Sequence, residues 1–267
     1  MQSNNLQKLR EKSPLIHNIT NIVVANYTAN GLLSLGCSPI MSNAIEEMDE
    51  IPALSQALVI NIGTLTSQTV QSMLKAGKSA NKHNVPVVLD PVGVGATTFR
   101  QETVNTLLSE IKFDLIRGNI GEIAHLAQAN WCSKGVDAGS GEADLSQIVK
   151  DVALEYDCIV SMSGEVDHIS DGKQVAKIYN GSALFPKITG SGCLLSAVCG
   201  AFLTLDTDSS NRFNLIVSAC TSYAIAGEIV QEKLSDTQTG QFYVGLLDSL
   251  AKLDDKTVEK YAKISYN

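Results

Sequence analysis

Short apolar runs rich in β-branched residues alternate with longer helical patterns along most of the chain, and this alternation restricts the possible folds more than any other feature. The runs are too short to be helices, so each is interpreted as a strand that is followed by a helix. Repeated strand–helix–strand units place parallel strands side by side and cover both faces of the sheet with helices. The expected strands are residues 15–17, 38–41, 58–62, 85–89, 115–117 and 159–162.

The pattern changes after residue 164, where two short runs at 166–170 and 175–179 flank a turn that contains glycine. This arrangement predicts an antiparallel hairpin at one edge of an otherwise parallel sheet. Two helices of small and apolar residues are expected at 193–205 and 213–232, either buried or packed against a neighbouring subunit. The chain of 267 residues is long enough to bury a large core and is expected to form a single domain over its whole length. The longest segment without a pattern, 131–142, is interpreted as an irregular surface excursion.

Each expected strand ends in polar residues or glycines that are unsuited to plain core packing. In an open α/β sheet, ligands bind beyond the carboxyl ends of the strands, so these residues are expected to converge on one crevice. Polar residues also simply terminate strands, but their recurrence at every strand end favours a site. They are Asn18, Thr20, Ser42, Asn43, Gly63, Thr64, Asp90, Gly118, Asn119, Ser163 and Gly164.

Two glycines, Gly190 and Gly192, stand immediately before a strongly apolar helix in the segment ITGSGCLLSAVCGAF. Glycine allows backbone conformations that aim successive N–H groups outward, and the start of a helix carries a partial positive charge. A phosphate or a developing oxyanion therefore fits this turn without a lysine. An ordinary glycine-rich helix start explains the same local pattern, so the neighbouring motifs have to decide between the two interpretations.

Cys193 occupies the first turn of that helix, where the helix dipole is expected to lower the pKa of its thiol below the free value of about 8.5. A thiolate that acts as base or nucleophile follows from this expectation. The competing interpretation is a cysteine that packs as a small hydrophobe, because no His or carboxylate lies close in sequence to complete a catalytic pair.

Arg117 and Glu122 lie at a strand-to-helix junction, which places one cation and one carboxylate beside the same crevice. The arginine is suited to pair phosphate oxygens and the glutamate to hold Mg²⁺. Asn119 and Glu122 also match a helix capping box, which is a sufficient structural explanation for the pair. Asp90, before Pro91 at another strand end, is a second hard oxygen ligand for Mg²⁺ or a simple turn residue.

The charge and the cysteines limit the partners and the compartment. Lys and Arg total 20 and Asp and Glu total 28, and the net charge of -8 provides no broad positive field for nucleic acid. The six cysteines contain no CxxC pair, which indicates reduced thiols and a cytoplasmic location. No apolar run approaches the roughly 18 residues of a membrane span, and the polar first residues lack a signal core, so no membrane partner is expected.

Taken together, five segments resemble the ribokinase-like superfamily, and within it the hydroxyethylthiazole kinases of thiamine salvage. The segments are PLIHNITNIVVANYTANGLLSLGCSPIMSNA, VVLDPVGVGAT, IRGNIGEI, SGEVDHISDG and KITGSGCLLSA. The resemblance runs over nearly the whole chain, and the first segment is long and specific whereas GSGC alone is weak. It implies a ribokinase-like three-layer α/β/α sandwich with a mostly parallel central sheet. It also implies phosphorylation by ATP, with Mg²⁺, of the hydroxyethyl group of 4-methyl-5-(2-hydroxyethyl)thiazole, in a homotrimer with active sites at subunit interfaces.

The same resemblance assigns residues to each ligand. The residues expected at the thiazole substrate are Asn21, Met41 and Gly190. The residues expected at ATP are Arg117, Ser163, Gly164 and Gly192. The residues expected at Mg²⁺ are Asp90 and Glu122.

Cys193 marks a departure within the superfamily, because most ribokinase-like enzymes carry an aspartate after the glycines as general base. Thiazole kinases resemble this chain in carrying a cysteine there. Phosphoryl transfer depends mainly on positioning and charge stabilisation, so a weaker base is tolerable, and Cys193 is expected to deprotonate or only to orient the alcohol. Two other functions remain open on the same scaffold: an ATP- or ADP-dependent dehydratase that repairs hydrated nicotinamide nucleotides, and a nucleotide-sensing protein without turnover.

Overall fold

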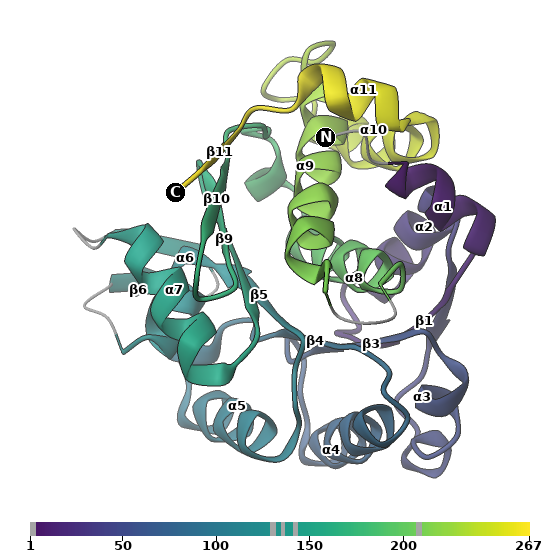
Figure 1. Cartoon of the computed structure of the whole chain (residues 1–267), viewed down its shortest axis with the longest axis vertical. Coiled ribbons are helices and arrows are strands. Elements are labelled where there is room, and N and C mark those ends of the chain that lie inside the picture. The colour runs from purple at the N-terminus through teal and green to yellow at the C-terminus, as the bar shows by residue number, and fades with distance from the viewer. Residues whose placement is uncertain (1–3, 129–131, 135–136, 141–143, 207–209) are drawn as a thin grey trace.

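A computed structural model describes residues 4–128, 132–134, 137–140, 144–206 and 210–267. These residues form a central sheet covered by helices on both faces (Figure 1). The parallel strands are β1 (Leu15–Ile19), β2 (Ser38–Met41), β3 (Ala57–Asn61), β4 (Val87–Asp90), β5 (Leu115–Asn119) and β8 (Ile159–Ser163). The remaining strands are β6 (Cys132–Lys134), β7 (Asp137–Ser140), β9 (Asp167–Ser170), β10 (Val175–Ile178) and β11 (Ile264–Tyr266).

The order of strands in the central nine-stranded sheet is β11-β10-β9-β8-β5-β4-β3-β1-β2. All neighbours from β2 to β8 pair in parallel. From β8 onward, β9, β10 and β11 pair antiparallel. The sheet is therefore mostly parallel with one antiparallel edge, as the sequence predicts.

The helices form a layer on each face of the sheet (Figure 1). One layer contains α1 (Asn5–Lys12), α2 (Ala25–Leu35), α8 (Ser191–Leu203), α9 (Arg212–Gln231), α10 (Thr239–Lys252) and α11 (Asp255–Tyr261). The other contains α3 (Ile51–Leu54), α4 (Ser67–Lys82), α5 (Thr98–Glu110), α6 (Ile120–Leu126) and α7 (Leu145–Tyr156). Three short 3₁₀ turns also occur in the described chain, at η1 (Ile45–Glu47), η2 (Val94–Ala96) and η3 (Phe185–Lys187).

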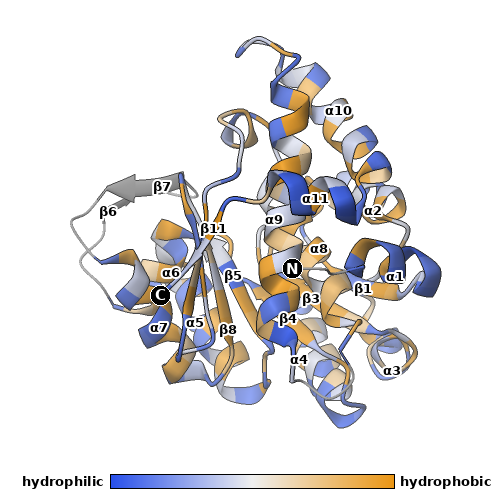
Figure 2. Ribbon diagram, turned by 45° about the horizontal axis from the view of Figure 1, so that its top comes forward, coloured by the Kyte–Doolittle hydropathy of each residue, from blue (hydrophilic) through white to orange (hydrophobic). Residues whose placement is uncertain are grey.

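Strand β3 shows why the sheet is buried on both faces. All five of its residues are buried. Successive side chains point to opposite faces, so Ala57 and Val59 join the core beneath α8, while Leu58 and Ile60 join the core beneath α4. A strand covered on both faces needs a continuous apolar run rather than an alternating one. Figure 2 shows hydrophobic residues along the central strands where the two helical layers meet the sheet.

The expected strands and the hairpin are all present, with bounds that differ by a few residues at their ends. Strand β11 was not predicted, because this three-residue run pairs with a strand that is distant in the sequence, with Ile178 opposite Ile264. The segment 131–142 was interpreted as irregular, but its described parts form β6 and β7, which pair antiparallel. Trp131, Gly135, Gly141 and Glu142 of that segment lie outside the described residues.

Helix α9 differs from the expectation that no apolar run approaches the length of a membrane span. It has 20 residues, and within the described chain it is long and apolar enough to span a bilayer, contrary to the prediction that no run approaches that length. However, 78% of its apolar window is buried inside the fold, between α8, α10 and the sheet. Its apolar character is that of a core helix.

Candidate active site

Four neighbouring parallel strands bring polar residues to the same edge of the sheet. Asn61 at the end of β3 lies opposite Asp90 at the end of β4, and Asn119 of β5 lies opposite Ser163 of β8. The helix α8 packs across β3 and β4 and carries its N-terminal turn to this edge. The predicted convergence of strand ends is therefore confirmed for these strands.

Asp90 lies at the centre of this edge, with a side chain that is only 1% exposed. Asn61 Nδ2 donates to its Oδ2 atom over 2.7 Å, and Ser196 Oγ donates to the same atom over 2.8 Å. Burial raises the pKa of the Asp90 carboxyl, whereas Arg117 and the two hydrogen bonds act in the opposite direction. Because both donors use Oδ2, the lone pairs of Oδ1 remain available for a ligand.

Asn61 connects Asp90 to the helix turn, although it was expected only as an interior residue of a strand. Its Oδ1 atom accepts hydrogen bonds from Asn21 Nδ2 at 3.0 Å and from the Gly63 N–H at 2.9 Å. Asn21 Nδ2 also lies 3.4 Å from Cys193 Sγ, as a donor to sulfur. A chain of amides thus runs from Asp90 to Cys193. The sequence does contain one indication of this role, an amide side chain within a strand that is otherwise wholly apolar.

Arg117 on β5 provides the cation of the site and is 6% exposed. Its Nη2 atom donates to Ser163 Oγ over 2.5 Å. Burial lowers the pKa of the guanidinium, but the charges of Asp90 and Glu122 outweigh it and raise the pKa above its ordinary value. A Cβ atom added to Gly192 would lie 2.7 Å from Arg117 Nη1, so the start of α8 touches the guanidinium only because this residue is glycine.

Glu122 forms the capping box that was one of the two interpretations of the sequence. Its Oε2 atom accepts from the Asn119 N–H at 2.8 Å, while Asn119 Oδ1 accepts from the Glu122 N–H at 2.9 Å, which confirms the capping box. Its Oε1 atom accepts from the Gly93 N–H at 2.9 Å. Burial, followed by the charge of Asp90, raises its pKa to about 7. The capping carboxylate therefore also faces Asp90 and Arg117.

The turn before α8 has the geometry expected of an anion site. Gly190 is the N-cap residue, its φ of 92° lies in the left-handed region, and it makes no side-chain cap. The first intrahelical bond is donated by the Leu194 N–H to Gly190 O, so the three preceding N–H groups have no acceptor within the helix. Tyr223 donates to Ser191 O at 2.7 Å and holds the turn in place.

The thiol of Cys193 differs from its expected state. Burial, followed by the charge of Asp90, raises its pKa to about 12, and the hydrogen bonds of Asn61 and Asn21 offset this only in part. The helix dipole was expected to lower this pKa, and that expectation is wrong for the protein without ligands. Desolvation outweighs the dipole because the thiol is largely removed from water and interacts with the charge of the buried Asp90 carboxyl.

Asp167, which the sequence analysis missed, supports the loop after β8. Its Oδ1 atom accepts from the Gly164 N–H at 3.0 Å, and its charge interacts with that of Arg117. Burial raises its pKa to about 6. Ser163 is therefore held to β5 by Arg117, and Gly164 is held to the start of β9 by Asp167.

Met41 lies apart from this hydrogen-bonded network. It ends β2 at the sheet edge, where its register partner is Asn18 of β1. It shares the carboxyl edge of the sheet with Asn21, but the contacts described above do not extend to it. Of the substrate residues predicted from the resemblance, Asn21 thus belongs to the hydrogen-bonded network, whereas Met41 does not.

Two carboxylates in this network, those of Asp90 and Glu122, are suited to a hard divalent cation. The described residues contain no cluster of three or more His, Cys, Asp or Glu that would hold a metal alone. Mg²⁺ usually takes one or two carboxylates and completes its shell with water and phosphate oxygens. The pair therefore fits Mg²⁺ that arrives with a nucleotide.

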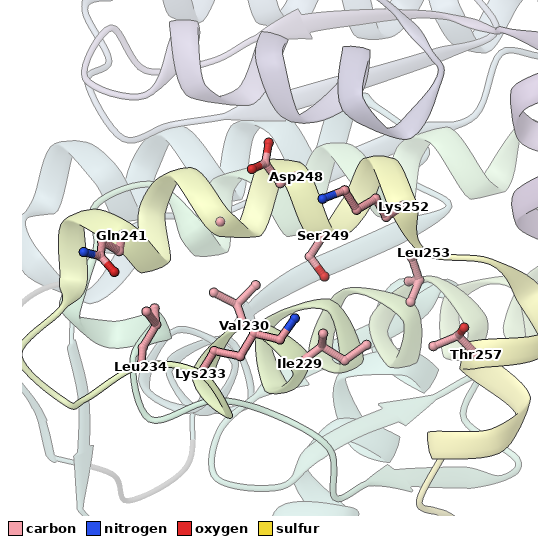
Figure 3. A pocket seen from close by; sticks show the side chains of 11 residues that line it. Ile229, Val230, Lys233, Leu234, Gln241, Asp248, Ser249, Lys252, Leu253 and Thr257 are labelled. Carbon is pink, nitrogen blue, oxygen red and sulfur yellow. The ribbon is translucent and has the colours of Figure 1, made fainter.

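A separate pocket of about 440 Å³ lies between α9, α10 and α11 (Figure 3). Its walls are mixed, with Ile229, Val230 and Leu253 beside Lys233 and Lys252. It shares no lining residue with the network around Asp90, so it adds nothing to the chemistry of that network.

Comparison with known proteins agrees with the resemblance found in the sequence. A family model described as the hydroxyethylthiazole kinase family matches residues 6–256. A hydroxyethylthiazole kinase of Pasteurella multocida is 61% identical over 261 residues, which make up 98% of this chain and 97% of that protein. A solved structure of the hydroxyethylthiazole kinase protein of Pyrococcus horikoshii has a TM-score of 0.89 at 39% identity and covers 98% of this chain and 97% of its own. A pyridoxal kinase of Staphylococcus aureus in complex with ADP has a TM-score of 0.62 at 11% identity, with 95% and 97% covered, and shares the fold alone.

Proposed function

The chain belongs to the hydroxyethylthiazole kinase family and has a ribokinase-like fold, and on this premise we propose how its residues carry out the reaction. It is a phosphotransferase that acts on an alcohol. The acceptor is the hydroxyethyl oxygen of 4-methyl-5-(2-hydroxyethyl)thiazole, and the donor is the γ-phosphoryl group of ATP. The relatives carry the kinase name at 54–61% identity, which favours this function over a dehydratase or a nucleotide sensor.

One observation carries the proposal for the site: Arg117 lies against Gly192 at the uncapped start of α8, with Asp90 and Glu122 beside it. A transferring phosphoryl group spreads negative charge over its oxygens, and its catalysis consists mainly of positioning and charge stabilisation. The free N–H groups of the turn and the guanidinium of Arg117 supply donors and positive charge at one place.

We assign the cation site to Asp90 and Glu122, whose carboxylate oxygens have the hard donor chemistry that Mg²⁺ prefers. Mg²⁺ held by these residues would supply positive charge that offsets the negative charge of the polyphosphate. Asn61 and Ser196 hold the Asp90 carboxylate in one orientation through its Oδ2 atom. We assign the ATP contacts to Arg117, Ser163, Gly164 and Gly192.

Cys193 is assigned to the substrate side of the turn, where it orients the alcohol as a neutral thiol. The pKa of about 12 argues against a thiolate base in the free protein. Asn21 contacts the same sulfur and is placed to contact the substrate, with Gly190 and Met41 at the same sheet edge. Full turnover in Cys193→Ala would show that the thiol has no chemical role.

We also propose the wider organisation of the protein: one domain over residues 1–267, a homotrimer with sites at subunit interfaces, and a cytoplasmic location. Two exposed apolar residues, Ile22 (81%) and Val23 (67%), follow Asn21 directly and support an interface beside the site. The described cysteines other than Cys132 are free thiols, which supports a reducing compartment.

The decisive experiment incubates the protein with Mg-ATP and hydroxyethylthiazole and follows ADP and the phosphorylated thiazole by mass spectrometry. The proposal expects both products in equal amounts. ADP without thiazole phosphate, or no ADP at adequate enzyme concentration, would contradict the proposed reaction. Incubation with hydrated nicotinamide nucleotide tests the dehydratase in parallel.

A further inference from the structure

Arg100 on α5 makes hydrogen bonds to three backbone carbonyls in the two loops that follow β3 and β4. Its Nη1 atom donates to Ile62 O at 2.8 Å and to Val92 O at 2.6 Å, and its Nη2 atom donates to Gly63 O at 2.7 Å. Arg100 makes no direct hydrogen bond to the side chains of Asp90, Glu122 or Arg117. Its sequence context does not predict a part in the reaction.

The first of these carbonyls belongs to the peptide group that joins residues 62 and 63. The N–H at the other end of that same peptide group is the Gly63 N–H, which donates to Asn61 Oδ1. Asn61 in turn donates to the Asp90 carboxylate. Arg100 therefore holds the carbonyl end of a peptide plane whose N–H end orients the partner of Asp90.

The second carbonyl repeats this arrangement in the next loop. Val92 O belongs to the peptide group that joins residues 92 and 93, and the Gly93 N–H of that group donates to Glu122 Oε1. Gly93 has a φ of 66°, so the loop turns sharply where it presents this N–H. One Nη1 atom thus contacts two peptide groups, and each of these donates to a different side chain of the site.

We propose that Arg100 is a positioning residue for Asp90 and Glu122, acting through the peptide groups 62–63 and 92–93. A hydrogen bond to a peptide carbonyl polarises the group and strengthens the bond made by its N–H, so the effect reaches the side chains as well as the loops. The planar fork of a guanidinium is needed to reach three carbonyls at fixed angles, and a lysine ammonium lacks that geometry.

The chain offers a matched control in Arg10 on α1. Its Nη2 atom likewise donates to three carbonyls, those of Leu250, Ala251 and Leu253, at the end of α10. Arg10→Gln removes the same kind and number of contacts as Arg100→Gln. These contacts lie at the end of α10, outside the hydrogen-bonded network around Asp90. The comparison separates a specific effect on the site from a general loss of hydrogen bonds.

The inference rests on the proposed cation site, so its test measures cation binding directly rather than turnover alone. Binding of Mn²⁺ in the presence of ADP is followed by electron paramagnetic resonance in the parent protein, Arg100→Gln, Arg100→Lys, Arg10→Gln, Glu122→Gln and the double variant Arg100→Gln/Glu122→Gln. Amide hydrogen exchange at Gly63 and Gly93 is measured in the same set. Thermal unfolding confirms which variants fold, and Arg100→Lys carries the test if Arg100→Gln does not fold.

We expect Arg100→Gln to weaken Mn²⁺ binding by about 10- to 100-fold, the usual effect of removing a residue that orients metal ligands. Arg100→Lys should recover part of this loss, Arg10→Gln should bind as the parent does, and the losses in the double variant should be less than additive. Exchange at Gly63 and Gly93 should accelerate in Arg100→Gln and in the double variant, less so in Arg100→Lys, and not in Arg10→Gln.

Parent-like Mn²⁺ binding in a folded Arg100→Gln, or an equal loss in Arg10→Gln, overturns the inference. Parent-like binding in Glu122→Gln would instead contradict the proposed cation role of Glu122. In that case amide exchange decides about Arg100. Faster exchange at Gly63 and Gly93 in the variants that lack Arg100, but not in Arg10→Gln, supports the inference, and unchanged exchange overturns it.

Discussion

Burial raises the pKa of four acids around Arg117: the carboxyls of Asp90, Glu122 and Asp167 and the thiol of Cys193. The charge of Arg117 acts against burial at each of them, but one guanidinium is shared among four groups. Without ligands, the site therefore favours the protonated, neutral forms of these four side chains more than free acids of the same types would. A bound cation reverses this preference, because it stabilises the ionised carboxylates that coordinate it.

The state of Cys193 can be tested by alkylation. With a pKa of about 12, the folded thiol stays protonated near neutral pH, so its rate of reaction with iodoacetamide should keep rising up to pH 10. Mass spectrometry of the peptide that contains Cys193 follows the rate. In urea the alkylation rate of the same peptide should reach half of its maximum near the ordinary thiol pKa. A plateau near pH 7 in the folded protein would show the thiolate that the helix dipole alone predicts.

Asp167 should make stability depend on pH in a defined window. Its pKa is 3.8 when unperturbed and about 6 in the fold, so between these values the unfolded chain releases a proton that the folded chain keeps. The free energy of unfolding that this group contributes is therefore present below about pH 4 and lost as pH rises to about 6. Relative to the parent, Asp167→Asn should gain stability across that window, measured as the urea midpoint at pH 4 and pH 7. An equal difference at both pH values would contradict the raised pKa.

Helix α8 contacts both Arg117 and Asp90 and so connects these two parts of the site. Its first turn lies beside Arg117 through Gly192, its next turn holds Asp90 through Ser196, and its remaining residues are buried against β3 and β4. The apolar body of the helix thus fixes where its polar start lies. The sequence indicated a helix that begins with glycines, and packing on the sheet determines what those glycines face.

Two substitutions in this helix start should have separable effects. Gly190→Ala should lower stability by about 1–2 kcal/mol, because its φ of 92° is left-handed and a Cβ would lie 2.8 Å from Val24 Cγ1. Gly192→Ala should cost little stability but displace the Arg117 guanidinium, since its Cβ would lie 2.7 Å from Nη1. Urea unfolding measures the first effect and the KM for ATP the second. A normal KM for ATP in Gly192→Ala would argue against a phosphate site at this contact.

At the scale of the whole molecule, the strand order decides which loops meet. β3, β4, β5 and β8 are neighbours, although about 40 residues separate the ends of β5 and β8 in the sequence. Because they are parallel, their carboxyl ends lie at one edge, where α8 covers them. β1 and β2 extend the same edge and carry Asn21 and Met41.

The proposed trimer can be tested through the exposed apolar residues beside the site. Ile22 is 81% exposed, so Ile22→Asp should leave the fold of the isolated chain intact but prevent assembly by placing a charge in an apolar interface. Light scattering after size exclusion measures the mass. Leu154→Asp on α7 is the matched control, since Leu154 is 64% exposed and lies on the other helical layer. A parent chain that is a monomer, or an Ile22→Asp variant that remains a trimer, would contradict the proposal.

The sequence alone determined the class of fold and predicted which charged residues meet at one edge of the sheet. Apolar runs of strand length separated by helical patterns permit little other than a doubly covered, mostly parallel sheet. Asp90, Arg117 and Glu122 were predicted as site residues because charged side chains at strand ends and at a strand-to-helix junction should face one crevice. The hairpin and the glycine-led helix were found from local turn chemistry, which needs no distant contacts.

Only the tertiary structure decided the protonation state of Cys193 and the parts played by Asn61, Asp167 and Arg100. A thiol pKa depends on which groups surround it in space, and the buried Asp90 carboxyl next to Cys193 is 103 positions away in the sequence. Arg100 donates to backbone carbonyls, which every residue has. No pattern of side chains in the sequence therefore predicts its contacts. Local sequence thus specified the elements, whereas desolvation and backbone hydrogen bonds, which exist only once the elements pack, specified the chemistry of the site.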